Sequence, residues 1–357
     1  MLTIIIPTRN RPNHCAAIIR FLTNQGTPHR IVVADSSDPA EAELLRTACP
    51  RETVIHSFPT EIGPADKYMA AIDLVDTPFA VLVPDDDITF PHALDRCLAY
   101  LIAHPDSMAA HGYILDFGIQ DHTFDLVRVR WFTPTIGEDD PLQRLYHLTQ
   151  RYQPFFWAVF RTDAFRTALR HARIPEIILF QEMTFMATSV LLGKVARLPC
   201  VYSLRGMEES LSLPSQTHPF FALLDDSEAF FEHYAVYRNA LAAFIESEIR
   251  PTSCEPSQLK HALNLMHAVA FAPAFDRGMT NYTLQRLLGE PHPPVTLARQ
   301  WTGVLPIEKE DFVGQSDHTG RRYVWRRSVL KAEPLDEITI TSDERDTVNK
   351  SLDHYKL

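Results

Sequence analysis

The feature that most constrains the fold of this sequence is the alternation of short apolar runs with helix-like segments in its first half. The apolar runs, rich in β-branched residues, cover residues 2–6, 31–34, 53–56 and 79–83. Runs of this kind are typical of strands buried on both faces of a parallel sheet. The amphipathic segments between and after them cover residues 12–23, 40–48 and 64–75. The alternation predicts a right-handed, doubly wound α/β sheet flanked by helices.

The remaining sequence predicts a domain boundary near Pro219, with an α/β domain at residues 1–219 and a mostly helical region at residues 220–357. Further strands are predicted at residues 125–131, 155–160 and 195–201. Further helices are predicted at residues 91–104, from residue 162, and at residues 181–192, 225–248 and 257–270. Thr341 and Glu344 have the spacing of a capping box, which predicts a terminal helix.

Composition and charge exclude several classes of protein. The chain has 357 residues and a formal net charge of -11. This charge argues against non-specific binding to nucleic acid, which needs clustered Lys and Arg, but permits a local site for one nucleotide. The five cysteines have neither zinc-site nor redox spacing, which predicts reduced thiols and a cytoplasmic location. We expect no transmembrane segment, because no run approaches the roughly 20 apolar residues that a membrane span needs.

Polar residues directly follow three of the predicted parallel strands, at the sheet edge where α/β proteins bind ligands. These are the loop at residues 6–10, then Asp35, and then the triplet Asp85, Asp86 and Asp87. Adjacent carboxylates repel one another unless a cation neutralises them, and Mg²⁺ takes carboxylate oxygens together with substrate phosphates. The position after an apolar strand favours a metal–diphosphate site over a solvated acidic turn before the next helix.

These motifs resemble those of family 2 glycosyltransferases, which have a GT-A fold. Residues 7–11, Pro-Thr-Arg-Asn-Arg, are similar to the turn after the family's first strand, and Asp35 ends the second strand. Residues 82–91, Leu-Val-Pro-Asp-Asp-Asp-Ile-Thr-Phe-Pro, are similar to the setting of the family's Asp-x-Asp motif. The resemblance covers roughly residues 1–205. It implies sugar transfer from a nucleotide diphosphate donor, with uridine as the expected base, assisted by Mn²⁺ or Mg²⁺.

The resemblance also implies roles for individual residues. Asp35 would read the nucleobase, and Asp85 would bind the ribose. Asp86 or Asp87 would bind the metal ion. The remaining donor-site candidates lie near the base, the ribose or the diphosphate, and they are Pro7, Thr8, Arg9 and Lys67. An exposed helix position is the alternative for the lysine.

The family's second landmark is an acidic pair that opens a helix, followed by a glycine and a strand containing Leu-Pro. Here the pair is Gln181 and Glu182, and the glycine is Gly193. Counted back from Gly193, Glu182 falls on the position of the catalytic base. An inverting transfer needs such a carboxylate to deprotonate the acceptor hydroxyl. The alternative for Glu182 is a first-turn residue favoured by the helix dipole.

Arg205 departs from the family pattern, because many relatives have a metal-binding His at this position. An arginine does not ligate a metal, but it binds phosphate, so either the metal has fewer protein ligands or Arg205 holds the diphosphate. The aromatic residues 155–157 either stack on an acceptor sugar or form a buried strand. The expected acceptor is a sugar, a glycan or a lipid-linked molecule, the last one met at the inner face of the membrane. The helical region is a candidate surface for homo-oligomer formation or acceptor binding.

The sequence leaves one other function open and disfavours two. A degenerate, non-catalytic sugar-nucleotide binder stays open because of Arg205 and Gln181. A nucleotidyltransferase is disfavoured because the loop at residues 7–12 contains no glycine. A glycosidase would leave the aspartate triplet at a strand end unexplained.

Overall fold

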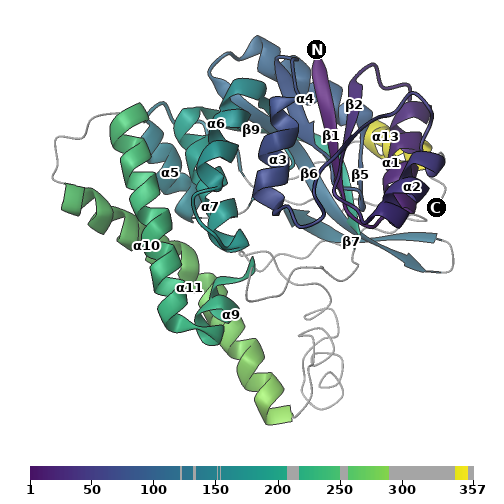
Figure 1. Cartoon of the computed structure of the whole chain (residues 1–357). Coiled ribbons are helices and arrows are strands. Elements are labelled where there is room, and N and C mark those ends of the chain that lie inside the picture. The colour runs from purple at the N-terminus through teal and green to yellow at the C-terminus, as the bar shows by residue number, and fades with distance from the viewer. Residues whose placement is uncertain are drawn as a thin grey trace.

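The structure, a computed structural model, describes residues 1–120, 123–131, 134–150, 152, 154–206, 217–249, 256–288 and 342–352. These residues form a mixed sheet covered by helices, and a group of later helices extends away from it (Figure 1). The predicted α/β fold is confirmed.

The first half alternates strands and helices as the sequence predicts. Its elements are β1 (Leu2–Thr8), α1 (Pro12–Asn24), β2 (Arg30–Asp35), α2 (Pro39–Ala48), β3 (Val54–Ser57), α3 (Pro64–Asp73) and β4 (Phe79–Leu82). A proline opens each of these helices, where its missing N–H and fixed φ cost nothing. Every residue of β1 is buried, as expected for a central parallel strand.

The middle of the chain is less regular and contains three elements that the sequence pattern did not predict, β5, β6 and α5. Its elements are β5 (Asp87–Thr89), α4 (Pro91–Ala103), β6 (Ser107–Gln120), β7 (Thr123–Trp131), α5 (Pro141–Gln150), β8 (Val159–Arg161), α6 (Thr162–Ala172), α7 (Ile178–Leu192) and β9 (Lys194–Gly206).

The prediction of a strand at residues 155–160 is wrong for residues 155–158. The structure has a strand only at Val159–Arg161, and the Ala158 N–H donates to the Phe155 carbonyl 2.9 Å away, which closes a turn. Phe155 is nevertheless buried, because the turn carries its ring into the core between the sheet and the helices. An apolar run therefore predicted burial correctly and the backbone conformation incorrectly.

The sheet order is β3-β2-β1-β4-β8-β6-β9-β5, and β7 pairs with β6. The neighbours β3-β2-β1-β4 are parallel, which confirms the doubly wound arrangement for this part. Beyond β4, the strand β8 is antiparallel to both β4 and β6, while β6 and β9 are parallel. At the end of this order, β5 pairs antiparallel with β9, so Asp87 and the two residues after it lie beside residues 203–205.

Gly193 allows β9 to begin close beside β6. A Cβ at this position would lie 2.9 Å from Met108 Cβ and 3.1 Å from the Asp106 carbonyl oxygen. Contacts this short exclude a side chain, because packed interiors leave no room for it. The glycine that serves as a sequence landmark is therefore required by the packing of the two strands.

The C-terminal region contains α9 (Pro219–Asp225), α10 (Ser227–Phe244), a π-helical turn (Ile245–Ile249), α11 (Pro256–Leu288) and α13 (Ser342–Leu352). The predicted helix at residues 225–248 is interrupted near its start, where Asp226 caps α10 by accepting from the Ala229 N–H at 2.9 Å. Helices α9, α10 and α11 lie together on one side of the molecule, whereas α13 lies near α1 and β9 (Figure 1). Thr341 lies outside the described residues, and the boundary at Pro219 stays a prediction.

Two apolar clusters cover the two faces of the sheet. One contains residues of α1, α2 and α4, together with Val348 of α13. The other contains residues of α3, α5, α6 and α7 and continues into α10 and α11. The second cluster joins the C-terminal helices directly to α7, the helix that carries Glu182.

Candidate functional site

The carboxyl ends of β1, β2 and β4 bring together the residues predicted to bind the donor. Thr8 and Asp35 are register partners at the ends of β1 and β2. Asp85 follows β4, and its Oδ2 accepts a 2.7 Å hydrogen bond from Thr8 Oγ1. Asp35 and Asp85 are both buried. The strand ends therefore place two carboxylates at one edge of the sheet.

The loop after β1 is held against the loop after β2 by Asn10. This residue has φ 56°, a left-handed conformation in which Asn is enriched among non-glycine residues. Its side-chain amide donates to Asp38 Oδ2 at 2.9 Å and accepts from the Asp38 N–H at 2.8 Å. Within the second loop, Asp35 Oδ1 accepts from the Ser37 N–H at 2.9 Å. The loops after β1 and β2 are thus connected by hydrogen bonds beside the carboxyl ends of these strands.

Lys67 lies in the first turn of α3 and is only 7% exposed. Its Nζ donates to the Thr8 carbonyl oxygen at 3.1 Å and to Ser36 Oγ at 3.0 Å. Burial lowers the pKa of Lys67, while the nearby charges of Asp85 and Asp35 oppose this shift. The predicted exposed-helix alternative is therefore wrong. Lys67 is a buried cation that links the β1 and β2 loops, and its role toward a diphosphate stays a prediction.

Arg11 contacts two of the three triplet carboxylates. Its Nη1 lies 2.6 Å from Asp86 Oδ2 and 3.4 Å from Asp85 Oδ1. Burial raises the pKa of Asp85, and the Asp86 charge adds to this, while the Thr8 hydrogen bond and the Arg11 charge oppose it. Arg11 is a site residue that the sequence analysis missed. Its signal was present, because it belongs to the Pro-Thr-Arg-Asn-Arg motif. Arg9, from the same motif, is exposed, and Pro7 is buried in β1.

Arg205 lies next to the third carboxylate. Asp87 opens β5, is buried, and is the direct register partner of Arg205 on β9. Directly opposed residues on antiparallel strands project from the same face of a sheet. The position at which the resemblance led us to expect a metal-binding His thus carries a cation opposite Asp87 of the triplet.

Glu182 lies in α7, and its Oε1 accepts a 3.2 Å hydrogen bond from the Tyr152 hydroxyl. Burial raises the pKa of Glu182, while the Tyr152 hydrogen bond and the Arg205 charge oppose this shift. Arg205 therefore lies close enough to act on Glu182 as well as facing Asp87. A carboxylate with a raised pKa is a stronger base than an ordinary glutamate, as an acceptor hydroxyl requires.

Comparison with known proteins identifies a family over part of the chain. Residues 3–170 match the model of Glycosyl transferase family 2. The chain carries a family 2 glycosyltransferase domain. The matched segment includes β1–β4, Asp35 and the whole aspartate triplet, and the resemblance inferred from these motifs is confirmed.

Solved structures similar to the chain include TarS from S. aureus, with 16% identity, a TM-score of 0.48, and coverage of 76% of this chain and 43% of that one. TarS residues 1–349 in complex with UDP-GlcNAc have 17% identity and a TM-score of 0.49, over 76% of this chain and 72% of that one. The mannosyl-3-phosphoglycerate synthase from Rubrobacter xylanophilus has 17% identity and a TM-score of 0.40, over 71% and 77% of the two chains. The chain thus spans less than half of the longer TarS chain. None of the curated proteins matches the chain significantly in sequence.

The residues of the family 2 domain fit a divalent cation only with help from a substrate. In the described part of the chain, no group of three or more His, Cys, Asp or Glu side chains could hold a metal ion. The triplet nevertheless offers hard carboxylate oxygens, and Mg²⁺ is commonly bound by one or two carboxylates plus substrate phosphates. Asp86 and Asp87 are thus suitable donors if a diphosphate supplies further oxygens.

Tyr68 of α3 forms an aromatic cluster with Phe156 and Trp157. The Tyr68 ring centroid is 5.5 Å from that of Phe156 and 6.5 Å from that of Trp157. Burial raises the pKa of Tyr68 to about 12, and the charges of Asp85 and Asp86 add to this. The aromatic residues 156–157 are partly exposed, so they are not simply a buried strand. Their role toward an acceptor stays a prediction.

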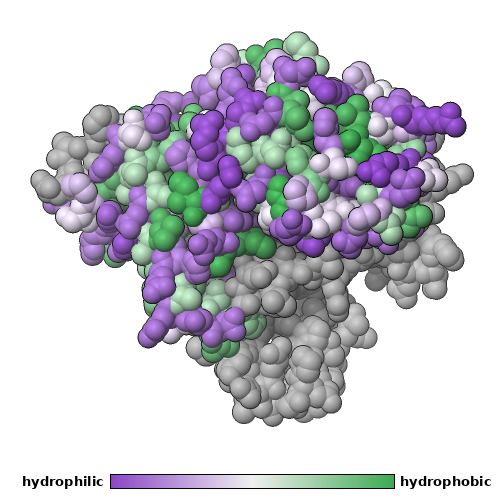
Figure 2. Space-filling model, in the orientation of Figure 1, coloured by the Kyte–Doolittle hydropathy of each residue, from purple (hydrophilic) through white to green (hydrophobic). Residues whose placement is uncertain are grey.

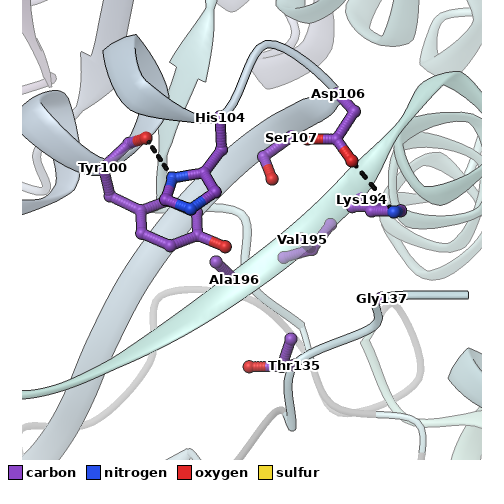
Figure 3. A pocket seen from close by; sticks show the side chains of 9 residues that line it. All are labelled: Tyr100, His104, Asp106, Ser107, Thr135, Gly137, Lys194, Val195 and Ala196. Carbon is purple, nitrogen blue, oxygen red and sulfur yellow. Dashed lines mark hydrogen bonds and ion pairs between the residues drawn. The ribbon is translucent and has the colours of Figure 1, made fainter.

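A separate cavity of about 250 Å³ lies at the other end of β9 (Figure 3). Lys194 opens this strand and pairs with Asp106 at 2.9 Å and Asp139 at 2.7 Å, while Tyr100 and His104 stack at 3.9 Å. β9 has 13 residues, so at about 3.3 Å per residue its ends lie on the order of 40 Å apart. This cavity is therefore remote from Arg205 and the triplet.

The surface of the described residues is mainly hydrophilic on the face shown in Figure 2, with small hydrophobic patches between charged side chains. Among the described helices, none is sufficiently long and apolar to cross a membrane.

Proposed function

We propose that the protein transfers a sugar from a nucleoside diphosphate donor, with UDP-sugars as the first candidates, to the hydroxyl of a sugar, glycan or lipid-linked acceptor. The observation that carries this proposal is the meeting of Thr8, Asp35 and Asp85 at the carboxyl edge of the parallel strands of a family 2 domain. That edge is where open α/β sheets bind nucleotides.

The donor would lie across the β1 and β2 loops. Asp35 would accept a hydrogen bond from the nucleobase, and Asp85 would accept from the ribose hydroxyls. Lys67 and Arg205 would supply positive charge toward the diphosphate, the former through the Thr8 loop that it holds. Thr8 fixes the orientation of the Asp85 carboxylate through their 2.7 Å hydrogen bond.

Asp86 and Asp87 would hold Mn²⁺ or Mg²⁺ together with the donor phosphates. The ion would supply positive charge that stabilises the leaving diphosphate. Arg11, which pairs with Asp86 at 2.6 Å, supplies countercharge to the carboxylates from the protein itself.

Glu182 would act as the general base of an inverting displacement. Its carboxylate takes the proton of the acceptor hydroxyl while the acceptor oxygen forms a bond to the anomeric carbon. The bond from that carbon to the diphosphate oxygen breaks at the same time, and the nucleoside diphosphate leaves with the electron pair. Support comes from the raised pKa of Glu182, caused mainly by burial, and from the nearby Arg205.

A thermal-shift screen of nucleotide sugars, with and without Mn²⁺, tests the proposed donor class. A donor at 100 times its Kd stabilises the native state by about 2.7 kcal/mol, which gives a clear rise in Tm. We expect one nucleotide sugar to raise Tm more than its free sugar does, and more with Mn²⁺. A donor that binds but is never turned over with any acceptor would favour the non-catalytic binder. Absence of any shift would count against both.

Asp35→Ala should weaken nucleotide binding and relax the preference for one base, because Asp35 is buried at the end of β2 beside the β1 loop. Loss of one hydrogen bond to a charged group predicts a loss of about tenfold to a hundredfold in affinity. Calorimetry with UDP, CDP and GDP measures both effects. Asp76→Ala removes an exposed aspartate that pairs with Arg30 and serves as the matched control. Unchanged affinity and base preference would make Asp35 a purely structural residue.

A further inference from the structure

Tyr152 lies between α5 and β8 and makes the one side-chain hydrogen bond that the structure gives to Glu182 within its described residues. Its hydroxyl donates to Glu182 Oε1 at 3.2 Å. The ring packs against the apolar cluster that joins α7 to the C-terminal helices. Burial raises the pKa of Tyr152 well above its ordinary value, and the Glu182 charge adds to this. The hydroxyl therefore keeps its proton and remains a donor to the carboxylate.

The C-terminal helices α10 and α11 share an apolar cluster with α7, the helix that carries Glu182. Tyr237 of α10 stacks on Phe180 of α7, with ring centroids 5.6 Å apart and an interplanar angle of 18°. Phe180 lies two residues before Glu182 in the same helix. Tyr237 also contributes electrostatically to the raised pKa of Tyr152. The helical region thus packs against the helix that carries Glu182.

A buried hydrogen-bond network fixes Tyr237 in turn. Tyr234 donates to Asn264 Oδ1 at 2.9 Å, so its oxygen accepts from His267 Nδ1 at 3.1 Å. His267 Nε2 is then left to accept from the Tyr237 hydroxyl at 2.7 Å. Burial lowers the pKa of His267 to about 4, so the ring is neutral and has one tautomer. Satisfied buried networks of this kind rigidify the elements that they join.

We propose that Tyr152 is a positioning residue that holds the Glu182 carboxylate toward the acceptor, and that α10 and α11 act as the support that keeps this pair in place. The proposal rests on the proposed function, because it assumes that Glu182 is the base. It assigns to the C-terminal helices a part in building the catalytic centre, through α7 and Tyr152.

Tyr152→Phe removes only the hydroxyl and keeps the ring in the apolar cluster. The groups whose charge or hydrogen bond favours ionised Glu182 are Tyr152 and Arg205, and both oppose the effect of burial. Loss of the hydroxyl therefore raises the pKa of Glu182 further, and the acid limb of the pH–rate profile moves to higher pH. A carboxylate without this bond is also less well oriented, so kcat falls by about tenfold or more.

The measurement is kcat, donor Kd and the pH profile for the parent, Tyr152→Phe and the control Tyr146→Phe, whose hydroxyl is on an exposed residue of α5. We expect a lower kcat, an unchanged donor Kd and an upward shift of the acid limb only in Tyr152→Phe. A parent-like kcat and pH profile would overturn the positioning role. A loss of kcat without the shift would assign Tyr152 to the fold alone.

Melting temperatures of Tyr152→Phe, Glu182→Gln and the double variant separate failure of this proposal from failure of the proposed function. The bond to an ionised carboxylate is stronger than the bond to an amide, so the two single effects on Tm should not add. If the parent transfers no sugar from any donor, the proposed function fails and the positioning role fails with it, while non-additive Tm values still establish the contact. Additive Tm values would overturn the contact itself.

Discussion

Glu182→Gln should lower the rate of sugar transfer by about 10²–10⁴-fold, the usual contribution of a positioned general base. Glutamine keeps the size of the side chain and an oxygen that accepts the Tyr152 hydrogen bond, so the fold should survive. Donor affinity should stay close to that of the parent, because a base contributes mainly in the transition state. Transfer rate and donor Kd, measured on the same preparation, check both parts of this expectation.

Matched controls separate Glu182 from the neighbouring glutamates. Glu176→Gln makes the same change six residues earlier, at an exposed position just before α7. Glu208→Gln tests a second candidate in the sequence after β9, where Glu209 is also present; both lie outside the described residues. If Glu182→Gln transfers sugar at the parent rate and Glu208→Gln does not, Glu182 is not the base. If neither variant lowers the transfer rate, the result favours a retaining mechanism or a non-catalytic function.

The raised pKa of Glu182 also gives the sign of two pH effects. A base must be deprotonated, so the transfer rate should fall as the pH drops through this raised pKa. A carboxyl whose folded pKa is raised contributes stability that is present below its unfolded pKa and is lost as the pH rises through the folded pKa. Glu182→Gln should therefore melt at the same temperature as the parent, or higher, above that pH. A lower Tm there would contradict the burial argument.

The sequence predicted which residues lie at the carboxyl edge of the sheet, because buried parallel strands are visible in a sequence as continuous apolar runs. Continuous apolar runs marked β1, β2 and β4 to within two residues, and the polar residue after each run then had to lie at one edge of the sheet. Thr8 and Asp85 are 77 positions apart in the chain, and the order of the strands brings them to the same edge, where the structure shows their 2.7 Å hydrogen bond. Local sequence patterns are therefore sufficient to predict which residues meet where strands and helices alternate regularly.

The same patterns do not contain the long-range contacts that complete the site. The pairing of β5 with β9, which brings Arg205 to Asp87, joins segments more than 100 residues apart through antiparallel geometry. Tyr152 lies in a connection without regular structure, so no periodicity marks its hydrogen bond to Glu182. Arg11 was visible in a motif, but only its 2.6 Å contact with Asp86 gives it a function.

The position of the C-terminal helix α13 also depends on contacts that the sequence pattern does not predict. Glu344 accepts from the Val201 N–H at 2.8 Å and pairs with Arg96 at 3.1 Å. These contacts hold the end of the chain against β9 and α4, although the sequence marked Glu344 only as part of a helix cap. A local motif shows where a helix begins and leaves its docking partner undetermined.

The double substitution Asp86→Asn and Asp87→Asn should abolish the gain in donor affinity that Mn²⁺ provides. Removing both carboxylates deletes the proposed protein ligands of the ion, and we expect a loss of at least about 100-fold, the upper end of the loss seen when only an outer-shell partner is removed. Asparagine preserves shape, and Asp86 is partly exposed, so the fold should tolerate the change there. Asp87 is buried beside Arg205, which makes Asp86→Asn alone the safer companion variant.

The decisive comparison is made with and without the metal. In EDTA, the double variant should bind the nucleoside diphosphate at least as well as the parent, because two negative charges near the phosphates are gone and Arg11 loses its 2.6 Å partner Asp86. With Mn²⁺, only the parent should gain affinity in calorimetry. Asp73→Asn with Asp76→Asn removes the same charge from an exposed pair that contacts Arg166 and Arg30, and it should behave as the parent does. Equal Mn²⁺ gains in the parent and the Asp86/Asp87 variant would refute metal binding by the triplet, and the positive charge for the leaving diphosphate would then have to come from the arginines and Lys67.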